Sequence, residues 1–261
     1  MDRSRGWRWG ASVAIAVALA GAATPGARAG GAGAAERRDI DCRVVRCVAI
    51  TFDDGPGLYI DKLLAALDDA GARATFFVLG DVVADRPSAL RKIAAAGHEI
   101  GDHTWNHREL PAMSDAEIRA ELTRTANLVQ SVTGRRPELM RPPYGEVSER
   151  VVDVLGARQW PIIQWSVDPE DWKDRNADTV YRRVIAGTHP GSIVLLHDIH
   201  ATTVAAVPRI LAALADRGYT FVTVSELYGG KLSAGVQYFT RNSAYVGKRP
   251  APGAKAEDAT D

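Results

Sequence analysis

Short apolar runs alternate with helical patterns along most of this chain. Seven runs, rich in β-branched and aromatic residues and bounded by turn residues, predict strands over 47–52, 74–79, 98–101, 138–141, 161–167, 192–196 and 219–224. Between them, 60–70 and 114–132 carry apolar residues at helical spacing, and the second segment opens with Ser114 and Glu117 in the pattern of a capping box. This alternation predicts a parallel α/β fold, either an open doubly wound sheet or a closed barrel.

The first residues have the order of a secretory signal peptide. Three arginines precede an apolar stretch over 11–20, and a small-x-small triplet follows at 27–29. The apolar stretch is too short and too rich in alanine to span a membrane, so we expect no stable membrane insertion once residues 1–29 are removed. The signal predicts a secreted, extracellular protein, with cell-wall association as an open alternative.

Composition divides the rest of the chain into three parts. The Gly/Ala-rich stretch 30–41 reads as a flexible linker, and the alternating elements place the folded domain over 42–230. Residues 231–261 form a C-terminal extension that ends in a tail of proline, alanine and charged residues. The extension contains apolar residues such as Tyr238 and Phe239, so we expect part of it to pack against the folded domain.

Charge and motif content exclude several functional classes. The 261 residues are 46% hydrophobic and 25% charged, which is ordinary for a globular domain and excludes disorder, collagen and coiled coil. Lys plus Arg equals Asp plus Glu at 32 each, so there is no basic excess for nucleic acid. Neither GxGxxG after the first strand nor GxxxxGK[ST] occurs, which removes dinucleotide and P-loop readings. We expect a monomer.

The chain has two cysteines, Cys42 and Cys47. Export to an oxidising compartment favours their pairing, whereas the alternative is two free thiols. Five residues of extended strand span about 16 Å, so pairing requires a turn through 43–46. Two cysteines are too few for a cysteine zinc site, and we predict a small disulfide clip ahead of the first strand.

Polar side chains gather where the predicted strands end. Five strand ends carry, in order, Asp53 and Asp54; His103 and His107; Arg141 and Tyr144; Asp168, Asp171 and Trp172; and His197 and Asp198. Both parallel architectures place their sites at the carboxyl edges of the strands. These segments are therefore predicted to meet at one rim.

The first two of these groups suggest metal chemistry. Asp53 and Asp54 are adjacent on a strand and are expected to point to different sides, so that one holds a metal and the other handles a proton. His103 and His107, at i and i+4, would lie on one face of a helical turn and hold one ion. Two histidines and one aspartate with an open position fit catalytic zinc, and they also suit non-haem iron.

Five ordered motifs resemble those of a known family. They are Thr51-Phe-Asp-Asp-Gly-Pro56, His103-Thr-Trp-Asn-His107, Arg141-Pro-Pro-Tyr-Gly145, Asp168-Pro-Glu-Asp-Trp172 and Leu195-Leu-His-Asp198. Together they resemble the NodB-type polysaccharide deacetylases, carbohydrate esterase family four, over 42–227. The resemblance implies a distorted (β/α)7 barrel, in agreement with the seven predicted strands.

The resemblance also implies a metal centre with a base beside it. Asp54, His103 and His107 correspond to the ligands of zinc or another divalent ion such as cobalt. Asp53 corresponds to the general base, and Arg141 to the arginine that orients it.

The remaining motifs imply an acid and substrate contacts. His197 corresponds to the general acid, which Asp171 keeps charged. The backbone N–H of Tyr144 would hold the oxyanion with the metal, Leu195 would line the pocket of the acetyl methyl group, and Trp172 would border the groove.

These assignments imply an exported, metal-dependent deacetylase. It would hydrolyse the acetamide of N-acetylglucosamine residues in peptidoglycan or a chitin-like polymer and release acetate. Peptidoglycan comes first because the cysteine clip resembles that of bacterial wall deacetylases. The alternatives are an acetylxylan esterase, a non-catalytic polysaccharide-binding protein and a non-haem iron oxygenase.

Overall fold

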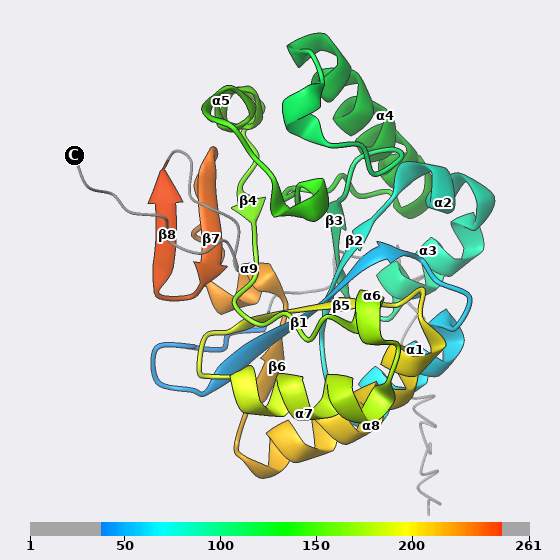
Figure 1. Cartoon of the computed structure of the whole chain (residues 1–261), viewed down its shortest axis with the longest axis vertical. Helices are drawn as coiled ribbons and strands as arrows, with labels where there is room; N and C mark the ends of the chain where they lie inside the picture. Colours follow the sequence, from blue (N-terminus) through cyan, green and yellow to red (C-terminus); the bar gives the residue numbers. More distant parts are fainter. Residues whose placement is uncertain (1–37, 247–261) are drawn as a thin grey trace, which may run out of the picture. The chain divides into compact units, whose positions relative to one another are not determined.

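The structure is a computed structural model that describes residues 38–246 (Figure 1). The predicted signal peptide, most of the predicted linker and the predicted tail from 249 lie outside the described residues. Strand β1 (Cys47–Gly55) is central and pairs in parallel with β2 (Thr75–Val78), β5 (Ile193–His197) and β6 (Thr220–Val222). Strand β3 (Glu99–Asp102) extends this parallel sheet beyond β2.

The two faces of β1 have different roles. Val48, Ile50 and Phe52 belong to the apolar layer between the sheet and the surrounding helices. Thr51 and Asp53, on the alternate positions, both contact a buried arginine on the other face. Strand periodicity therefore directs polar side chains towards one face at the carboxyl end of β1, where a site can form.

A second group of strands continues the circuit. Met140 bridges in parallel to Asp102 at the end of β3 and to β4 (Ile162–Ile163), and β4 pairs in parallel with β7 (Val236–Thr240). Thr240 then bridges to Ser192 beside β5. The strands thus form an α/β barrel of mainly parallel strands. It closes through isolated bridges, an antiparallel one between Thr240 and Ser192 and a parallel one between Val167 and Val194, which agrees with the predicted distorted barrel.

Two predicted strands are shorter than expected. The segment 138–141 forms only the bridges of Met140, because Pro142 and Pro143 follow directly and supply no backbone N–H donors. The segment 161–167 is reduced to β4 and one bridge at Val167. Both nevertheless occupy their predicted places in the strand order.

Helices cover the strands from outside. Their bounds are α1 Ile60–Asp69, α2 Gly80–Asp85, α3 Pro87–Ala95, α4 Asp115–Thr133, α5 Glu149–Ala157, α6 Asp171–Asp174, α7 Ala177–Gly187, α8 Ala201–Asp216 and α9 Val224–Leu227, with 3-10 turns η1 Leu110–Ala112 and η2 Pro143–Gly145. Helix α8 packs against α1 and α7, whereas α4 packs against α2 and α3 (Figure 1). The predicted capping box of α4 forms between Ser114 and Glu117. Within residues 38–246, no helix is both long and apolar enough to cross a membrane.

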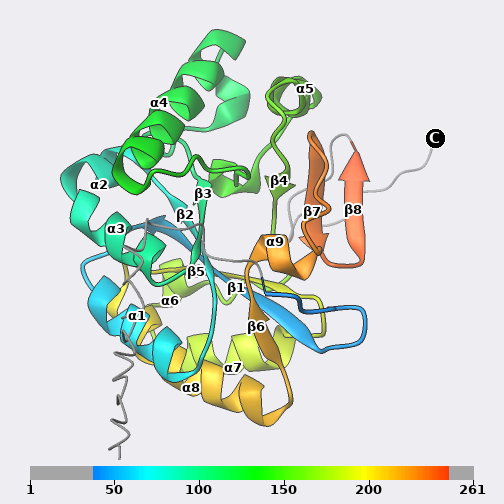
Figure 2. The same cartoon turned by 180° about the vertical axis from the view of Figure 1, so that it is seen from behind.

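A hairpin near the end of the described chain was not predicted. Strands β7 and β8 (Ser243–Val246) pair antiparallel, and β7 lies beside β4 in both views (Figures 1 and 2). Tyr238 and Phe239 of β7 are buried. The first part of the C-terminal extension therefore contributes a strand to the barrel.

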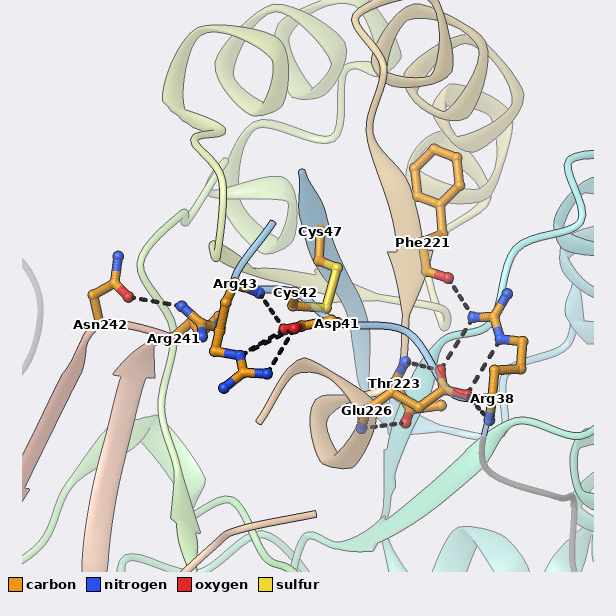
Figure 3. The surroundings of a disulfide bond; sticks show 10 residues. All are labelled: Arg38, Asp41, Cys42, Arg43, Cys47, Phe221, Thr223, Glu226, Arg241 and Asn242. Carbon is orange, nitrogen blue, oxygen red and sulfur yellow. Dashed lines mark hydrogen bonds and ion pairs between the residues drawn. A yellow bond between two sulfur atoms is a disulfide. The ribbon is translucent and has the colours of Figure 1, made fainter. Parts of the chain in front are cut away.

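The disulfide clip is present between Cys42 and Cys47, whose Cα atoms are 5.5 Å apart (Figure 3). A turn over 43–46 brings the two cysteines together, as predicted, because the N–H groups of Val44 and Val45 both donate to the carbonyl of Asp41. Upstream of the clip, Arg38 forms an ion pair with Glu226 at 3.1 Å. The segment before β1 is thus attached to the barrel at two points.

Candidate active site

The residues of the predicted metal centre converge at the carboxyl ends of the strands. Asp53 and Asp54 lie at the end of β1, and His197 ends β5 as the register partner of Asp53. His103 and His107 lie in the loop that follows β3. The structure therefore brings together side chains that are up to about 140 positions apart in the sequence.

The two adjacent aspartates point to the same place, contrary to the expected alternation. The β1–β2 register shifts between Asp53 and Gly55, and Asp54 takes a φ of 69°. Such a bulge adds a residue to one strand and re-aims its side chain. As a result, carboxylate oxygens of Asp53 and Asp54 lie 3.7 and 3.4 Å from Nε2 of His103.

The two histidines are not on a helical turn, so that expectation was wrong. Residues 103–107, which we call the histidine loop, contain two non-glycine residues at positive φ, Thr104 at 72° and His107 at 60°. The N–H of Thr104 donates to Asp102, and the N–H of His107 donates to the hydroxyl of Thr104 at 3.1 Å. Local hydrogen bonding of this kind favours a turn over a helix.

The donor set of Asp54, His103 and His107 fits a divalent metal ion. Oδ1 of Asp54 lies 3.4 Å from Nε2 of His103 and 3.5 Å from Nε2 of His107. Two ligand atoms of one tetrahedral zinc ion are about 3.3 Å apart. Oδ1 of Asp54 is buried and has no hydrogen-bond partner among the described residues, and the three side chains form the one group within 38–246 with the spacing of metal ligands.

Protonation states also favour a cation here. Nδ1 of His103 lies 2.7 Å from the carbonyl oxygen of Arg141 and donates to it, so Nε2 is the ring nitrogen that faces the site and becomes a ligand once it gives up its proton. Burial raises the pKa of Asp54, but without a metal ion His103 is protonated, and its charge outweighs burial and holds the pKa of Asp54 well below its usual range. Asp54 is therefore a carboxylate at neutral pH.

Arg141 holds the carboxylate of Asp53 through a buried hydrogen bond. Its guanidinium is fully buried and donates to Asp53 at 2.7 Å, to the hydroxyl of Thr51 at 2.8 Å, and to the carbonyls of Ile163 and Gln164 at 3.2 and 3.0 Å. With these donors Arg141 holds one carboxylate oxygen of Asp53 in place. The second oxygen faces the histidines, where it can accept a proton.

The half-buried His197 and the buried Asp171 form a second pair on the same rim. Nδ1 of His197 lies 2.8 Å from Asp171, which also accepts from the backbone N–H of His197 at 2.8 Å and from Thr203 at 2.7 Å. Burial by itself would lower the pKa of His197, but the hydrogen bond and charge of Asp171 prevail, with Asp53 and Asp54 adding to them, and raise it to about 9. The imidazole of His197 is therefore protonated at neutral pH, and its Nε2–H is available as a proton donor.

The predicted substrate contacts lie at different depths. Tyr144 is 56% exposed, has a φ of 60°, and meets the ring of His107 edge-on at 4.5 Å between centroids. Trp172, on α6 directly after Asp171, is 48% exposed. Leu195 is buried in the barrel core beside Trp165, two positions before His197.

The sequence analysis placed Asp198 at this rim but assigned no role to it. Asp198 is fully buried and accepts from the N–H of Gly57 at 3.0 Å, and burial raises its pKa to about 7. A Cβ atom on Gly55 would lie 2.2 Å from this carboxylate. The position of Asp198 directly after His197 was the available signal. His200, the N-cap residue of α8, is buried, and its Nδ1 lies 2.9 Å from the guanidinium of Arg175.

Fold and site together define a class: a parallel α/β barrel whose carboxyl rim carries a two-histidine, one-aspartate centre between two buried ion pairs. The sequence profile of the polysaccharide deacetylase family matches residues 41–160. The chain is 44% identical over 202 residues to the peptidoglycan-N-acetylglucosamine deacetylase PgdA of Listeria monocytogenes, covering 77% of this chain and 43% of PgdA. It thus spans less than half the length of that relative.

Two further comparisons, one with a whole protein and one with the chain of a solved structure, cover most of the length of that chain. A peptidoglycan-N-acetylglucosamine deacetylase of Bacillus cereus is 36% identical over 188 residues, which cover 70% of this chain and 88% of that protein. The structure of the peptidoglycan deacetylase PdaC from Bacillus subtilis superposes with a TM-score of 0.70 at 37% identity, covering 74% of this chain and 94% of that one. This chain belongs to the polysaccharide deacetylase family, and both the predicted resemblance and the predicted fold class are confirmed.

Proposed function

We propose that this protein is a secreted, metal-dependent deacetylase that removes acetyl groups from N-acetylglucosamine residues of peptidoglycan. The observation that carries the proposal is the placement of the Asp54, His103 and His107 donor set between a buried carboxylate and a half-buried, charged imidazole. Hydrolysis of an amide needs an activated water, a base and an acid. All three requirements have a candidate on this rim.

A divalent ion at the donor set would polarise the acetyl carbonyl and lower the pKa of water. Asp53 lies within 3.7 Å of Nε2 of His103, and its free oxygen accepts the proton of the attacking water. Arg141 keeps Asp53 in position through an ion pair of 2.7 Å between two buried side chains. The backbone N–H of Tyr144, beside His107, is assigned to the oxyanion of the tetrahedral intermediate.

His197 donates the second proton. The amine leaving group of an acetamide is expelled only when its nitrogen is protonated, so the reaction requires an acid on the far side of the scissile bond. Asp171 holds Nδ1–H of His197 and favours the imidazolium, which leaves Nε2–H to donate to the sugar nitrogen. The alkoxide of an ester leaves more readily, so this acid is required for hydrolysis of an amide and matters less for an ester.

The assignment of peptidoglycan is supported by the relatives described above, which are peptidoglycan deacetylases. Tyr144 and Trp172 expose aromatic surface at the rim, which suits the apolar faces of pyranose rings. The buried Leu195 approaches the rim from the core and is assigned to the acetyl methyl group.

We further propose that the enzyme works outside the cell. The order of residues 1–29 supports export, and the Cys42–Cys47 disulfide supports an oxidising compartment.

Acetate release by the purified chain tests the proposal. The chain is incubated with Zn²⁺ or Co²⁺ and with N-acetylated peptidoglycan, chitooligosaccharides or acetylated xylan. Asp53→Asn should keep the metal and lose turnover, whereas His103→Ala should lose the metal. Release from the amino-sugar polymers supports a deacetylase; release from xylan alone would identify an esterase, and release from none would leave a binding protein. Iron in the purified protein, with activity that depends on it and on oxygen, would point to the oxygenase.

A further inference from the structure

The histidine loop supplies two of the three proposed metal ligands but contains little regular structure of its own. Thr104 and His107 both have positive φ values, 72° and 60°. Such backbone conformations cost about 1 kcal/mol or more for residues other than glycine and persist only where the surroundings impose them. The position of both imidazoles therefore depends on contacts made by other elements.

Helix α2 holds the loop from one side. The first N–H groups of this helix, on Gly80 and Asp81, donate to the carbonyls of Thr104 and Trp105, each at 3.0 Å. These N–H groups have no partner within their own helix, so the loop supplies acceptors that the helix start needs.

Helix α4 holds the loop from the opposite side through Glu121. One carboxylate oxygen of Glu121 accepts from the N–H of Trp105 at 3.0 Å and from the N–H of Asn106 at 3.3 Å. Both N–H groups lie between the two histidines in the sequence. Hydrogen bonds to an ionised acceptor are about twice as strong as neutral ones.

The same face of α4 also holds the side chain of Trp105. Arg124 follows Glu121 by three positions and therefore lies on the same side of α4. Its guanidinium carbon lies 3.4 Å from the centre of the indole ring of Trp105. On the other side, the ring covers Gly80 so closely that a Cβ atom there would lie 2.3 Å from it. Trp105 is therefore enclosed between α4 and the start of α2.

We propose that Glu121, supported by Arg124, is a positioning residue for the metal centre. The inference rests on the proposed function, since it concerns the same donor set. Glu121 fixes the peptide groups of Trp105 and Asn106, and this fixes the backbone from which His103 and His107 project. Without it, the loop can relax from its positive φ values and the two Nε2 atoms no longer share one ion with Asp54.

Metal affinity of four variants of the full chain tests this role. Glu121→Ala removes the acceptor, Glu121→Gln keeps one amide oxygen in its place, and Arg124→Ala removes the cover of the exposed side of Trp105. Asp115→Ala is the matched control, because Asp115 is a carboxylate on the same helix whose partners are Arg150 and Arg119. Dissociation constants for Zn²⁺ come from competition with a chelating dye, and the visible spectrum of bound Co²⁺ reports coordination geometry.

We expect Glu121→Ala to weaken Zn²⁺ binding about 10- to 100-fold, as is typical for loss of groups that orient metal ligands. It should also alter the Co²⁺ spectrum, whereas Glu121→Gln should recover most of the affinity. Arg124→Ala should weaken binding several-fold, and Asp115→Ala should match the wild type. Circular dichroism establishes that each variant is folded.

Wild-type affinity and an unchanged Co²⁺ spectrum in folded Glu121→Ala would overturn this inference and leave the proposed function intact. If Glu121→Ala does not fold, Arg124→Ala decides, because its side chain is exposed and its loss should not unfold the chain. Unchanged affinity in Arg124→Ala would then overturn the inference. Failure of the wild-type chain itself to bind Zn²⁺ or Co²⁺ would instead refute the proposed function.

Discussion

Replacement of Asp171 by asparagine tests the proposed acid most directly. The carboxylate of Asp171 accepts three hydrogen bonds, two from His197 and one from Thr203. Asparagine has a single acceptor oxygen, so it cannot satisfy the backbone N–H and the Nδ1–H of His197 from two separate oxygens. It also removes the negative charge that stabilises the imidazolium.

The size of the effect follows from the pKa of His197. Asp171, with Asp53 and Asp54, raises this pKa from the ordinary 6.5 to about 9. Because the pKa is raised, His197 stays protonated up to about pH 9 in the wild type. If Asp171→Asn removes the whole increase, His197 stays protonated only up to about pH 6.5. At pH 8 the protonated fraction would then fall from about 91% to about 3%, a loss of about 30-fold in rate. At pH 5.5 the two proteins should differ little on this account.

The assay is the rate of acetate release between pH 5 and pH 10 with the metal-loaded enzymes. The alkaline limb of kcat/KM should move down by between about 1 and 2.5 pH units in Asp171→Asn. A bound cation lowers the pKa of His197 in both proteins, so the displacement between the two limbs is the quantity to compare. Thr203→Val, which removes a partner of Asp171 but keeps its charge, is the control.

An NMR titration of the His197 ring in the metal-free proteins gives a second readout. An alkaline limb at the same pH in Asp171→Asn and wild type, with an unmoved His197 titration, would refute the electrostatic role of Asp171. A loss of rate that is equal at every pH would show that Asp171 only supports the structure.

Three further outcomes follow from buried contacts. Arg141→Met leaves the carboxylate of Asp53 buried without its partner and should lower the free energy of unfolding by about 3–5 kcal/mol in urea titrations; a loss below 1 kcal/mol would contradict the buried pair. Gly55→Ala places a Cβ atom 2.2 Å from the carboxylate of Asp198, so we expect about 1–3 kcal/mol of destabilisation and weaker Zn²⁺ binding. Wild-type stability and affinity would show that the side chain of Asp198 moves aside without cost. Reduction of the disulfide should raise the intact mass by two daltons and cost about 2 kcal/mol, and an unchanged mass would exclude the bond.

The periodic parts of the fold were predictable because their signal is local. The helical spacing over 60–70 and 114–132 corresponds to α1 and α4, and the capping box of Ser114 and Glu117 forms as its spacing indicates. Buried parallel strands read as continuous apolar runs, which is why β1 and β5 were placed correctly. The hairpin of β7 and β8 was missed because its strands are short and its burial depends on β4, a distant partner.

The same distinction applies to the site. Residue types and their order along the chain indicated which segments meet, since parallel strands share one carboxyl edge. The way in which they meet was decided by features without a sequence period. These are the bulge at Asp54, the positive φ values in the histidine loop and the buried position of Asp198.

The sequence by itself thus indicated the class of fold, the segments that carry polar residues to one rim, and, through the resemblance to a family, the set of ligands, base and acid that we propose. Only the tertiary structure decided that Asp53 and Asp54 point at one ion site, that the histidines approach it from a loop, and that Glu121 holds that loop in place. The physical reason is that periodicity and propensity act over a few residues. Bulges, strained loops and buried carboxylates persist only when elements far apart in the sequence impose them.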